Sequence, residues 1–173
     1  MRLFVAIDLP DAVKDQLDGL CAGVSGAKWV KREQMHLTLR FIGEVDAHQF
    51  KTIQSALGDI RCTPFEIALK GVGQFPPKGR PRVLWAGITA PRTLQQLVGS
   101  VEAALRETGI PPEERPFSPH ITLARLKTPP PQEAVSQYFR RHGGFQTAGI
   151  PVTQFVLMSS VLARTGATYT VEG

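Results

Sequence analysis

The stretch SPHITLAR at residues 118–125 repeats a short pattern that the chain has already used as HLTL at residues 36–39. Both copies read His-aliphatic-Thr-Leu, in a chain with only four histidines. Side chains two residues apart in a β-strand point to the same face. Each copy therefore predicts a strand with His and Thr on one face and aliphatic residues on the other, where they anchor the strand to a core.

The two HxT pairs are His36 with Thr38 and His120 with Thr122. Their shared face must meet polar surroundings, because a buried imidazole or hydroxyl without a partner costs a few kcal/mol, on the order of 2–7. A single HxT strand is weak evidence, because a lone strand histidine is more often structural than catalytic. The other two histidines, His48 and His142, fall at unrelated offsets and are expected on the surface.

The order of elements around the two motifs also repeats. Each half is expected to run strand, helix, HxTL strand, helix, strand, and VAIDLP before the first helix parallels WAGITAP before the second. A Gly/Pro-rich stretch at 71–82 is expected to be a mobile loop or lobe boundary. The patterns predict strands at 2–9, 36–42, 64–70, 82–88, 120–126, 151–160 and 168–171, and helices starting near 11, 46, 91 and 131.

This repeat predicts an α+β fold with two pseudo-symmetric lobes around a central cleft. Each lobe is expected to be an antiparallel sheet with helices on its outer face. The whole chain, residues 1–173, is predicted to form one bilobal domain, with approximate lobes at 1–75 and 80–173 and scope for strand exchange between them. If the lobes face each other, the two imidazoles and two hydroxyls surround one groove.

Such a set of groups suits a phosphodiester. Threonine hydroxyls can donate hydrogen bonds to nonbridging oxygens. One neutral imidazole can take a proton from water while a cationic one protonates the leaving alkoxide, because histidine titrates near neutral pH. This chemistry requires no covalent nucleophile, no cofactor and no metal.

Composition sets the broader limits. The net charge of +5 and the pI near 9.6 fit a polyanionic partner such as RNA, and they fit an ordinary basic protein as well. Two cysteines, Cys21 and Cys62, are too few for a disulfide framework, which favours a reducing compartment. The apolar run at 3–7 is too short for a membrane span or a signal peptide. We therefore expect a cytoplasmic protein.

The chain resembles the 2H phosphoesterases, and within them the RNA 2′,3′-cyclic phosphodiesterases first named 2′–5′ RNA ligases. The resemblance rests on four blocks in order: RLFVAIDLP, HLTLRFIGEV, RVLWAG and RPFSPHITLAR. It implies a two-lobed α+β architecture and metal-independent hydrolysis of a terminal 2′,3′-cyclic phosphate to a 2′-phosphomonoester. It also implies an RNA partner with cyclic phosphate ends, tRNA fragments among the candidates, a monomer, and 2′–5′ ligation as a reverse activity.

Carried over residue by residue, the resemblance makes His36 the general acid and His120 the general base. Thr38 and Thr122 would hold the phosphate, together with Arg125. Strand alternation places Arg125 on the Leu123 face, so a twist or the end of the strand would be needed to bring it to the site.

Other residues keep two interpretations each. Arg40 shares the His36 face and is either a phosphate ligand or a surface ion-pair partner. The loop cations either follow an RNA backbone or are simply solvated, and three aromatic residues either stack a base or belong to the core. Asp8 either orients a histidine or begins the first helix. The loop cations are Lys78, Arg80 and Arg82, and the aromatic residues are Phe75, Trp85 and Phe117.

Three alternative functions remain open on sequence alone. The first is another 2H cyclic phosphodiesterase acting on a small nucleotide. The second is an RNA-end-binding module without turnover, which would not need a histidine in both motifs. The third is a two-histidine metal site, which lacks suitably placed Asp, Glu or Cys ligands within the motifs.

Overall fold

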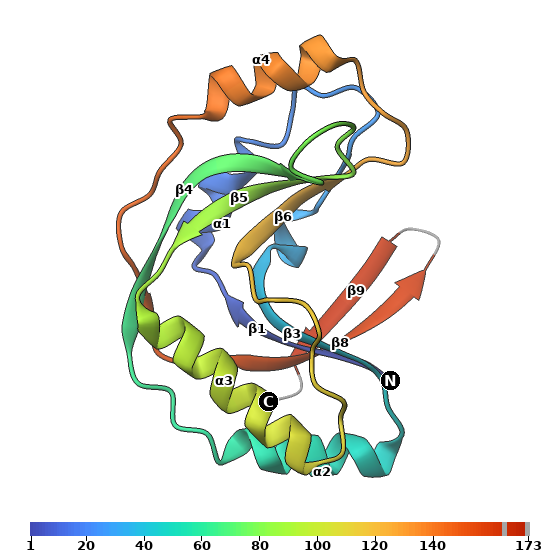
Figure 1. Cartoon of the computed structure of the whole chain (residues 1–173), viewed down its shortest axis with the longest axis vertical. Helices are drawn as coiled ribbons and strands as arrows, with labels where there is room; N and C mark the ends of the chain where they lie inside the picture. The colour runs from blue at the N-terminus through green and yellow to red at the C-terminus, as the bar shows by residue number, and fades with distance from the viewer. Residues whose placement is uncertain (164–165, 172–173) are drawn as a thin grey trace.

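Two antiparallel β-sheets face each other across the middle of the molecule, with helices outside them (Figure 1). The structure is a computed structural model and describes residues 1–163 and 166–171. The first sheet has the order β3-β1-β8-β9 and the second has the order β2-β6-β5-β4-β7. The first comprises β1 (Arg2–Asp8), β3 (His36–Glu44), β8 (Val156–Ala163) and β9 (Gly166–Val171). The second comprises β2 (Lys28–Trp29), β4 (Phe65–Phe75), β5 (Val83–Thr89), β6 (His120–Arg125) and β7 (Ile150–Val152).

The helices lie on the outer faces of the sheets, two with each sheet. In Figure 1, α2 and α3 lie below the first sheet, and α4 lies above the second. The Tyr138 hydroxyl of α4 donates a hydrogen bond of 2.8 Å to the carbonyl of Leu20, just after α1. The helices are α1 (Asp11–Asp18), α2 (Ala47–Gly58), α3 (Arg92–Glu107) and α4 (Gln132–His142), with a short 3₁₀ turn at Arg32–Gln34. The predicted α+β class with two sheets and outer helices is confirmed.

Local sequence explains where the helices begin and which face they bury. Asp46 caps α2 through a reciprocal capping box with Gln49, which satisfies donors at the helix start. Helix α3 follows Pro91 and buries its apolar stripe at Leu94, Leu97, Val98, Val101 and Leu105. In the part of the chain that the structure describes, no helix has the length and apolar character to cross a membrane.

The two sheets repeat the same local arrangement around their histidine strands. In the first sheet β3 pairs with β1, and β1 pairs in turn with β8. In the second sheet β6 pairs with β5, and β5 pairs with β4. The sheets do not follow the two halves of the chain, because β2 and β4 join the second sheet while β8 and β9 join the first.

Two predicted elements differ from the structure, and one short strand was not predicted. The expected strand at 151–160 is two strands, β7 and β8, which pair in different sheets. Strand β4 runs to Phe75, through glycines that suggested a loop. Gly73 is required there by close packing, since a Cβ on it would lie 2.3 Å from the ring of Trp85. The two-residue strand β2 is too short to show a periodic pattern.

Candidate active site

Strand β3 carries a β-bulge directly after its HxT motif. Between Thr38 and Arg40 the partner strand β1 advances by only one residue, so Leu39 is an extra residue. The bulge breaks the alternation of faces, and both Leu39 and Arg40 are buried. Phe41 consequently returns to the His36 face and is 62% exposed.

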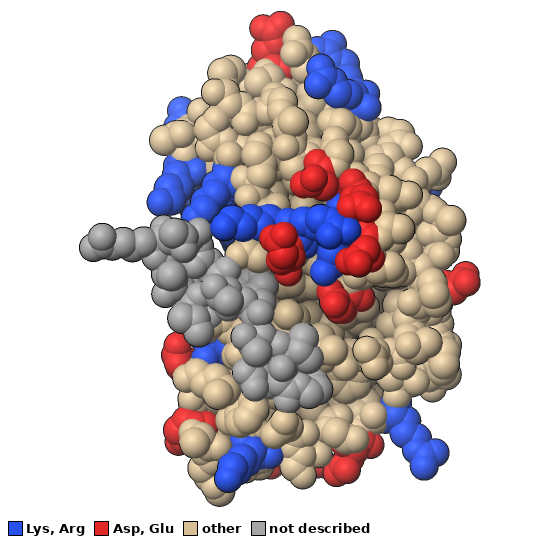
Figure 2. All heavy atoms as spheres, turned by 180° about the vertical axis from the view of Figure 1, so that it is seen from behind, with Lys and Arg blue, Asp and Glu red and all other residues tan. Residues whose placement is uncertain are grey.

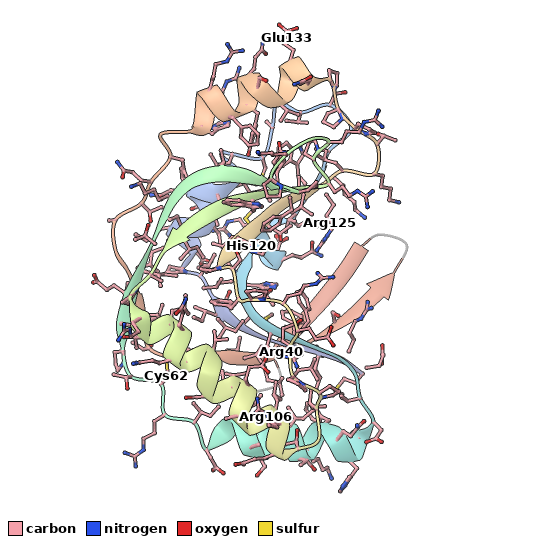
Figure 3. All side chains as sticks on the ribbon, in the orientation of Figure 1. Arg40, Cys62, Arg106, His120, Arg125 and Glu133 are labelled. Carbon is pink, nitrogen blue, oxygen red and sulfur yellow. The ribbon has the colours of Figure 1, made fainter. Side chains whose placement is uncertain are left out.

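Strand β6 carries the same bulge at the same offset from its histidine. Between Thr122 and Ala124 the partner strand β5 advances by one residue, which makes Leu123 the extra residue. Leu123 and Ala124 are both fully buried, and Arg125 is exposed. The expectation that Arg125 shares the Leu123 face is therefore wrong, because the bulge returns Arg125 to the face of His120. Figure 3 shows both labelled side chains along this strand.

Arg40 plays neither of the two roles considered for it. It is only 8% exposed, and its guanidinium pairs with the carboxylate of Glu102 on α3. The same guanidinium donates to the backbone carbonyls of Phe41 and Pro111. Arg40 thus lies on the core side of the bulge, where it ties β3 to α3 and to the segment after that helix.

His36 is half-buried at the start of β3, beside one aromatic ring and two charged residues. Its ring stacks on Phe4, with centroids 4.9 Å apart and planes 24° apart. Asp8 is its cross-strand neighbour in β1, and the Asp8 carboxylate lies 3.1 Å from Lys14 Nζ. Burial lowers the pKa of His36 to about 4, Asp8 acts in the opposite direction, and Lys14 adds to the lowering. His36 is therefore neutral near pH 7 when no ligand is bound.

The His120 ring is held by a backbone carbonyl and two aromatic rings. Its Nδ1 lies 2.7 Å from the carbonyl oxygen of Ser118, two residues earlier in the chain. A carbonyl only accepts hydrogen bonds, so Nδ1 carries the proton and the neutral ring keeps its Nε2 lone pair free. Phe75 meets the ring edge-on at a centroid distance of 4.9 Å, and Trp85 lies at 6.3 Å.

The two histidine strands come from different sheets and meet in the middle of the molecule. Strands β3 and β6 are in contact although they share no sheet, and Figure 1 shows them on facing sides of the central space. Thr38 and Thr122 are half-buried on the same faces as their histidines. The structure therefore brings together the two strands that carry the five residues selected from the sequence.

The remaining candidate residues fall into three places: beside His120, in the core and on the exposed loop. Phe75 and Trp85 flank the His120 ring, and Phe117 packs against the main core. The three loop cations Lys78, Arg80 and Arg82 are all exposed. Among the residues with described side chains, no three His, Cys, Asp or Glu side chains gather in a group able to hold a metal ion.

Sequence reasoning missed two features of the site. The first is the Ser118 carbonyl, whose only signal is the Pro119 that keeps Ser118 extended. The second is the exposed Phe41, which strict alternation from His36 would place with Leu37 and Leu39 on the core side of the strand. Its signal is the repeated offset, since Phe41 follows His36 by the same five residues that separate Arg125 from His120.

Comparisons with known proteins agree with this geometry. The family model described as LigT like Phosphoesterase matches residues 7–85 and 88–169, so each matched segment carries one HxT motif. A curated RNA 2′,3′-cyclic phosphodiesterase from Archaeoglobus fulgidus is 34% identical over 98% of this chain and 96% of its own length. A curated protein of the same name from Escherichia coli K12 is 35% identical over 98% and 92%.

Solved structures give the same result. The crystal structure of TT0787 from Thermus thermophilus aligns with a TM-score of 0.82 and 34% identity, covering 100% of this chain and 96% of that one. Escherichia coli LigT in complex with 3′-AMP aligns with a TM-score of 0.78 and 32% identity, covering 99% and 95%. The chain therefore belongs to the LigT-like phosphoesterases of the 2H family, and its enzyme class is that of the cyclic phosphodiesterases.

Proposed function

We propose that the protein hydrolyses the 2′,3′-cyclic phosphate at the end of an RNA chain to a 2′-phosphate and a free 3′-hydroxyl. The observation that carries the proposal is the pair of HxT strands, which come from two different sheets, carry the same bulge and contact each other in the middle of the molecule. The RNA 2′,3′-cyclic phosphodiesterase name of the curated relatives supports the choice of substrate.

The proposed base is His120. With Nδ1–H held by the Ser118 carbonyl, Nε2 accepts a proton from water as the water oxygen attacks phosphorus. The bond from phosphorus to the 3′ oxygen breaks, and the 2′ ester bond remains. His36 donates its proton to the departing 3′ oxygen. The reaction therefore ends with His120 protonated and His36 neutral, the reverse of their starting states.

The proposed acid role of His36 requires a cationic ring, whereas the ring is neutral near pH 7 in the ligand-free site. The negative charge of the bound phosphate favours the protonated imidazole and raises its pKa. Acid competence is therefore coupled to substrate binding. A ring that is desolvated beforehand, stacked on Phe4, also transfers its proton readily once it is charged.

Three further groups are proposed to hold the substrate. Thr38 and Thr122 donate hydrogen bonds to nonbridging phosphate oxygens, and Arg125 supplies positive charge from the end of β6. The exposed ring of Phe41 offers a surface on which the terminal base can stack, an interaction of roughly 1–3 kcal/mol. The mechanism assigns no task to a metal or cofactor. Ligation in reverse and a monomeric state stay predictions from the resemblance.

The test is to incubate the protein with an oligonucleotide that ends in a 2′,3′-cyclic phosphate and to separate the isomeric products by chromatography. We expect a 2′-phosphate, undiminished turnover in excess chelator, and losses of roughly 10²–10⁴-fold for His36→Ala and for His120→Ala. His48→Ala, on an exposed helical position, is the control. A 3′-phosphate product would reverse the acid and base assignments, and full activity of folded His120→Ala would refute the mechanism.

A further inference from the structure

A row of cations lies at the end of the second sheet, beside the proposed phosphate site. Lys28 of β2 and Arg125 of β6 are directly paired across neighbouring strands, about 4.8 Å apart in the pairing direction. Directly opposed residues point to the same face of a sheet, so Lys28 shares the face of Arg125. Arg82 belongs to the same end, because its carbonyl accepts a 2.8 Å hydrogen bond from the Leu126 backbone. Lys127 follows next along the chain and is exposed.

The hairpin between β4 and β5 adds two more cations to this end of the sheet. Lys78 and Arg80 are both exposed on it. The Gln74 side chain donates from Nε2 to the carbonyls of Pro76 at 2.9 Å and Gly79 at 3.2 Å. The Arg82 backbone N–H closes the hairpin on the carbonyl of Phe75 at 2.8 Å. These hydrogen bonds give the hairpin a defined shape, so Lys78 and Arg80 project from an ordered turn.

No acidic residue lies near these cations in the sequence segments that carry them. Residues 19–32, 67–101 and 115–132 contain no Asp or Glu at all. Within the described part of the chain, none of the cations in this row takes part in an ion pair. We call the row the basic rim, consisting of Lys28, Lys78, Arg80, Arg82 and Lys127.

The charges around α1 behave differently and provide a contrast. Arg32 pairs with Asp15 at 2.8 Å and lies 3.8 Å from Asp11, and Lys14 pairs with Asp8. Figure 2 shows the face of the molecule that is turned away in Figure 1. Acidic and basic side chains, red and blue, are interleaved in the middle of this face, while blue side chains without red neighbours gather at its upper left. That side corresponds to the right of Figure 1, where β6 ends and the β4–β5 hairpin turns. The positive charge at this end of the second sheet is therefore open to an anionic partner, whereas the charge around α1 is already neutralised.

We propose that the basic rim binds the phosphodiester backbone of the RNA on the 5′ side of its cyclic end. This inference rests on the proposed function, because it takes the end of the chain to lie at the HxT strands. Arg125 connects the two regions, since it faces the site and is the strand neighbour of Lys28. An RNA whose terminal phosphate lies at Thr122 and Arg125 would continue over the rim, where each phosphate gains a cation without displacing a carboxylate. The rim thus selects RNA chains over cyclic mononucleotides.

The experiment compares two substrates on three proteins over a range of salt concentrations. The substrates are a nucleoside 2′,3′-cyclic monophosphate and a ten-nucleotide RNA ending in the same cyclic phosphate. The rim variant carries Lys28→Gln, Arg82→Gln and Lys127→Gln. The control removes three exposed cations from the region of α2 and α3, on the other sheet, through Lys51→Gln, Arg61→Gln and Arg106→Gln. Both variants lose the same net charge.

We expect the rim variant to lose at least about 10-fold in kcat/KM on the oligonucleotide at low salt and to match wild type on the mononucleotide. The dependence of log kcat/KM on log salt should become shallower by about 0.7 for each lost phosphate contact. Equal losses on both substrates, or a rim variant indistinguishable from the control, would overturn the proposal.

A binding measurement separates this proposal from the proposed function. Fluorescence anisotropy with a labelled ten-nucleotide RNA bearing a terminal 2′-phosphate requires no turnover. Weaker, less salt-dependent binding by the rim variant than by the control supports the rim even if neither cyclic substrate is hydrolysed. Equal binding by both variants refutes the rim, whatever the activity.

Discussion

Lowering the pH should destabilise the folded protein specifically through His36. Burial holds the pKa of His36 at about 4 in the folded state, against an ordinary value of 6.5. Between these values the unfolded chain binds a proton that the folded chain does not, so the free energy of unfolding rises with pH. Above pH 6.5 His36 is neutral in both states and does not change the free energy of unfolding. As the pH falls toward 4, its contribution lowers that free energy progressively. At about 1.4 kcal/mol for each pH unit, the full interval amounts to about 3 kcal/mol.

Urea unfolding at pH 7.5 and at pH 5 measures this penalty. We expect wild type to lose about 2 kcal/mol more than His36→Gln between the two pH values, since most of the interval has then been crossed. The lowered pKa of His142 acts in the same direction but is common to both proteins and cancels in the difference. His48→Gln is the matched control and should follow wild type. If His36→Gln shows the wild-type pH dependence, the imidazole is well solvated and the stacked, desolvated site beside Phe4 is wrong.

Two further predictions concern packing. Glu102→Gln should lower the free energy of unfolding by about 3–5 kcal/mol in urea titrations, because it leaves the buried Arg40 charge uncompensated; a loss below about 1 kcal/mol would show that the pair is solvated. Gly73→Ala should displace the Trp85 ring beside the active site. We expect reduced turnover in the activity assay and a changed tryptophan emission spectrum for this variant. Its control is Gly99→Ala in α3, where a Cβ meets nothing within 4 Å and where the protein should gain up to about 1 kcal/mol; unchanged turnover and fluorescence in Gly73→Ala would contradict the packing argument.

Most of the secondary structure is predictable because its signals are local. Alternation within HLTL and HITL identifies two strands and places each His with its Thr, and capping residues and apolar stripes identify the helices. The repeated order of elements then predicts two similar lobes. The signals for single strands and helices lie within the element concerned or directly beside it, and only the repeat compares distant parts of the chain.

The features that sequence reasoning missed depend on a partner strand. Whether Leu39 is an extra residue is decided by the register between β3 and β1, and strand alternation carries no information on that register. The missed bulge at Leu39 reverses the assignments of the residues directly after it, which is why strict alternation places Arg40 and Phe41 on the wrong faces. The division of 151–160 into β7 and β8 has a similar cause, because the apolar residues on either side of Thr153 and Gln154 do not reveal that they pair in different sheets.

The shared bulge also explains how a nearly symmetric scaffold can perform an asymmetric reaction. In both strands the fifth residue after the histidine returns to the active-site face, but it is an exposed aromatic ring, Phe41, in one sheet and a cation, Arg125, in the other. The histidines differ as well, since Ser118 fixes the proton on one ring nitrogen of His120, whereas His36 is desolvated against an aromatic ring. In the proposed mechanism both threonines hold the phosphate, and the asymmetry lies in the other groups: Phe41 contacts the base and His36 releases a proton, whereas Arg125 adds positive charge and His120 accepts a proton. Exchanging the two residues, as Phe41→Arg with Arg125→Phe, should therefore strongly reduce turnover in a folded protein, because the histidines would keep their surroundings while the ring and the cation would each lie in the wrong sheet.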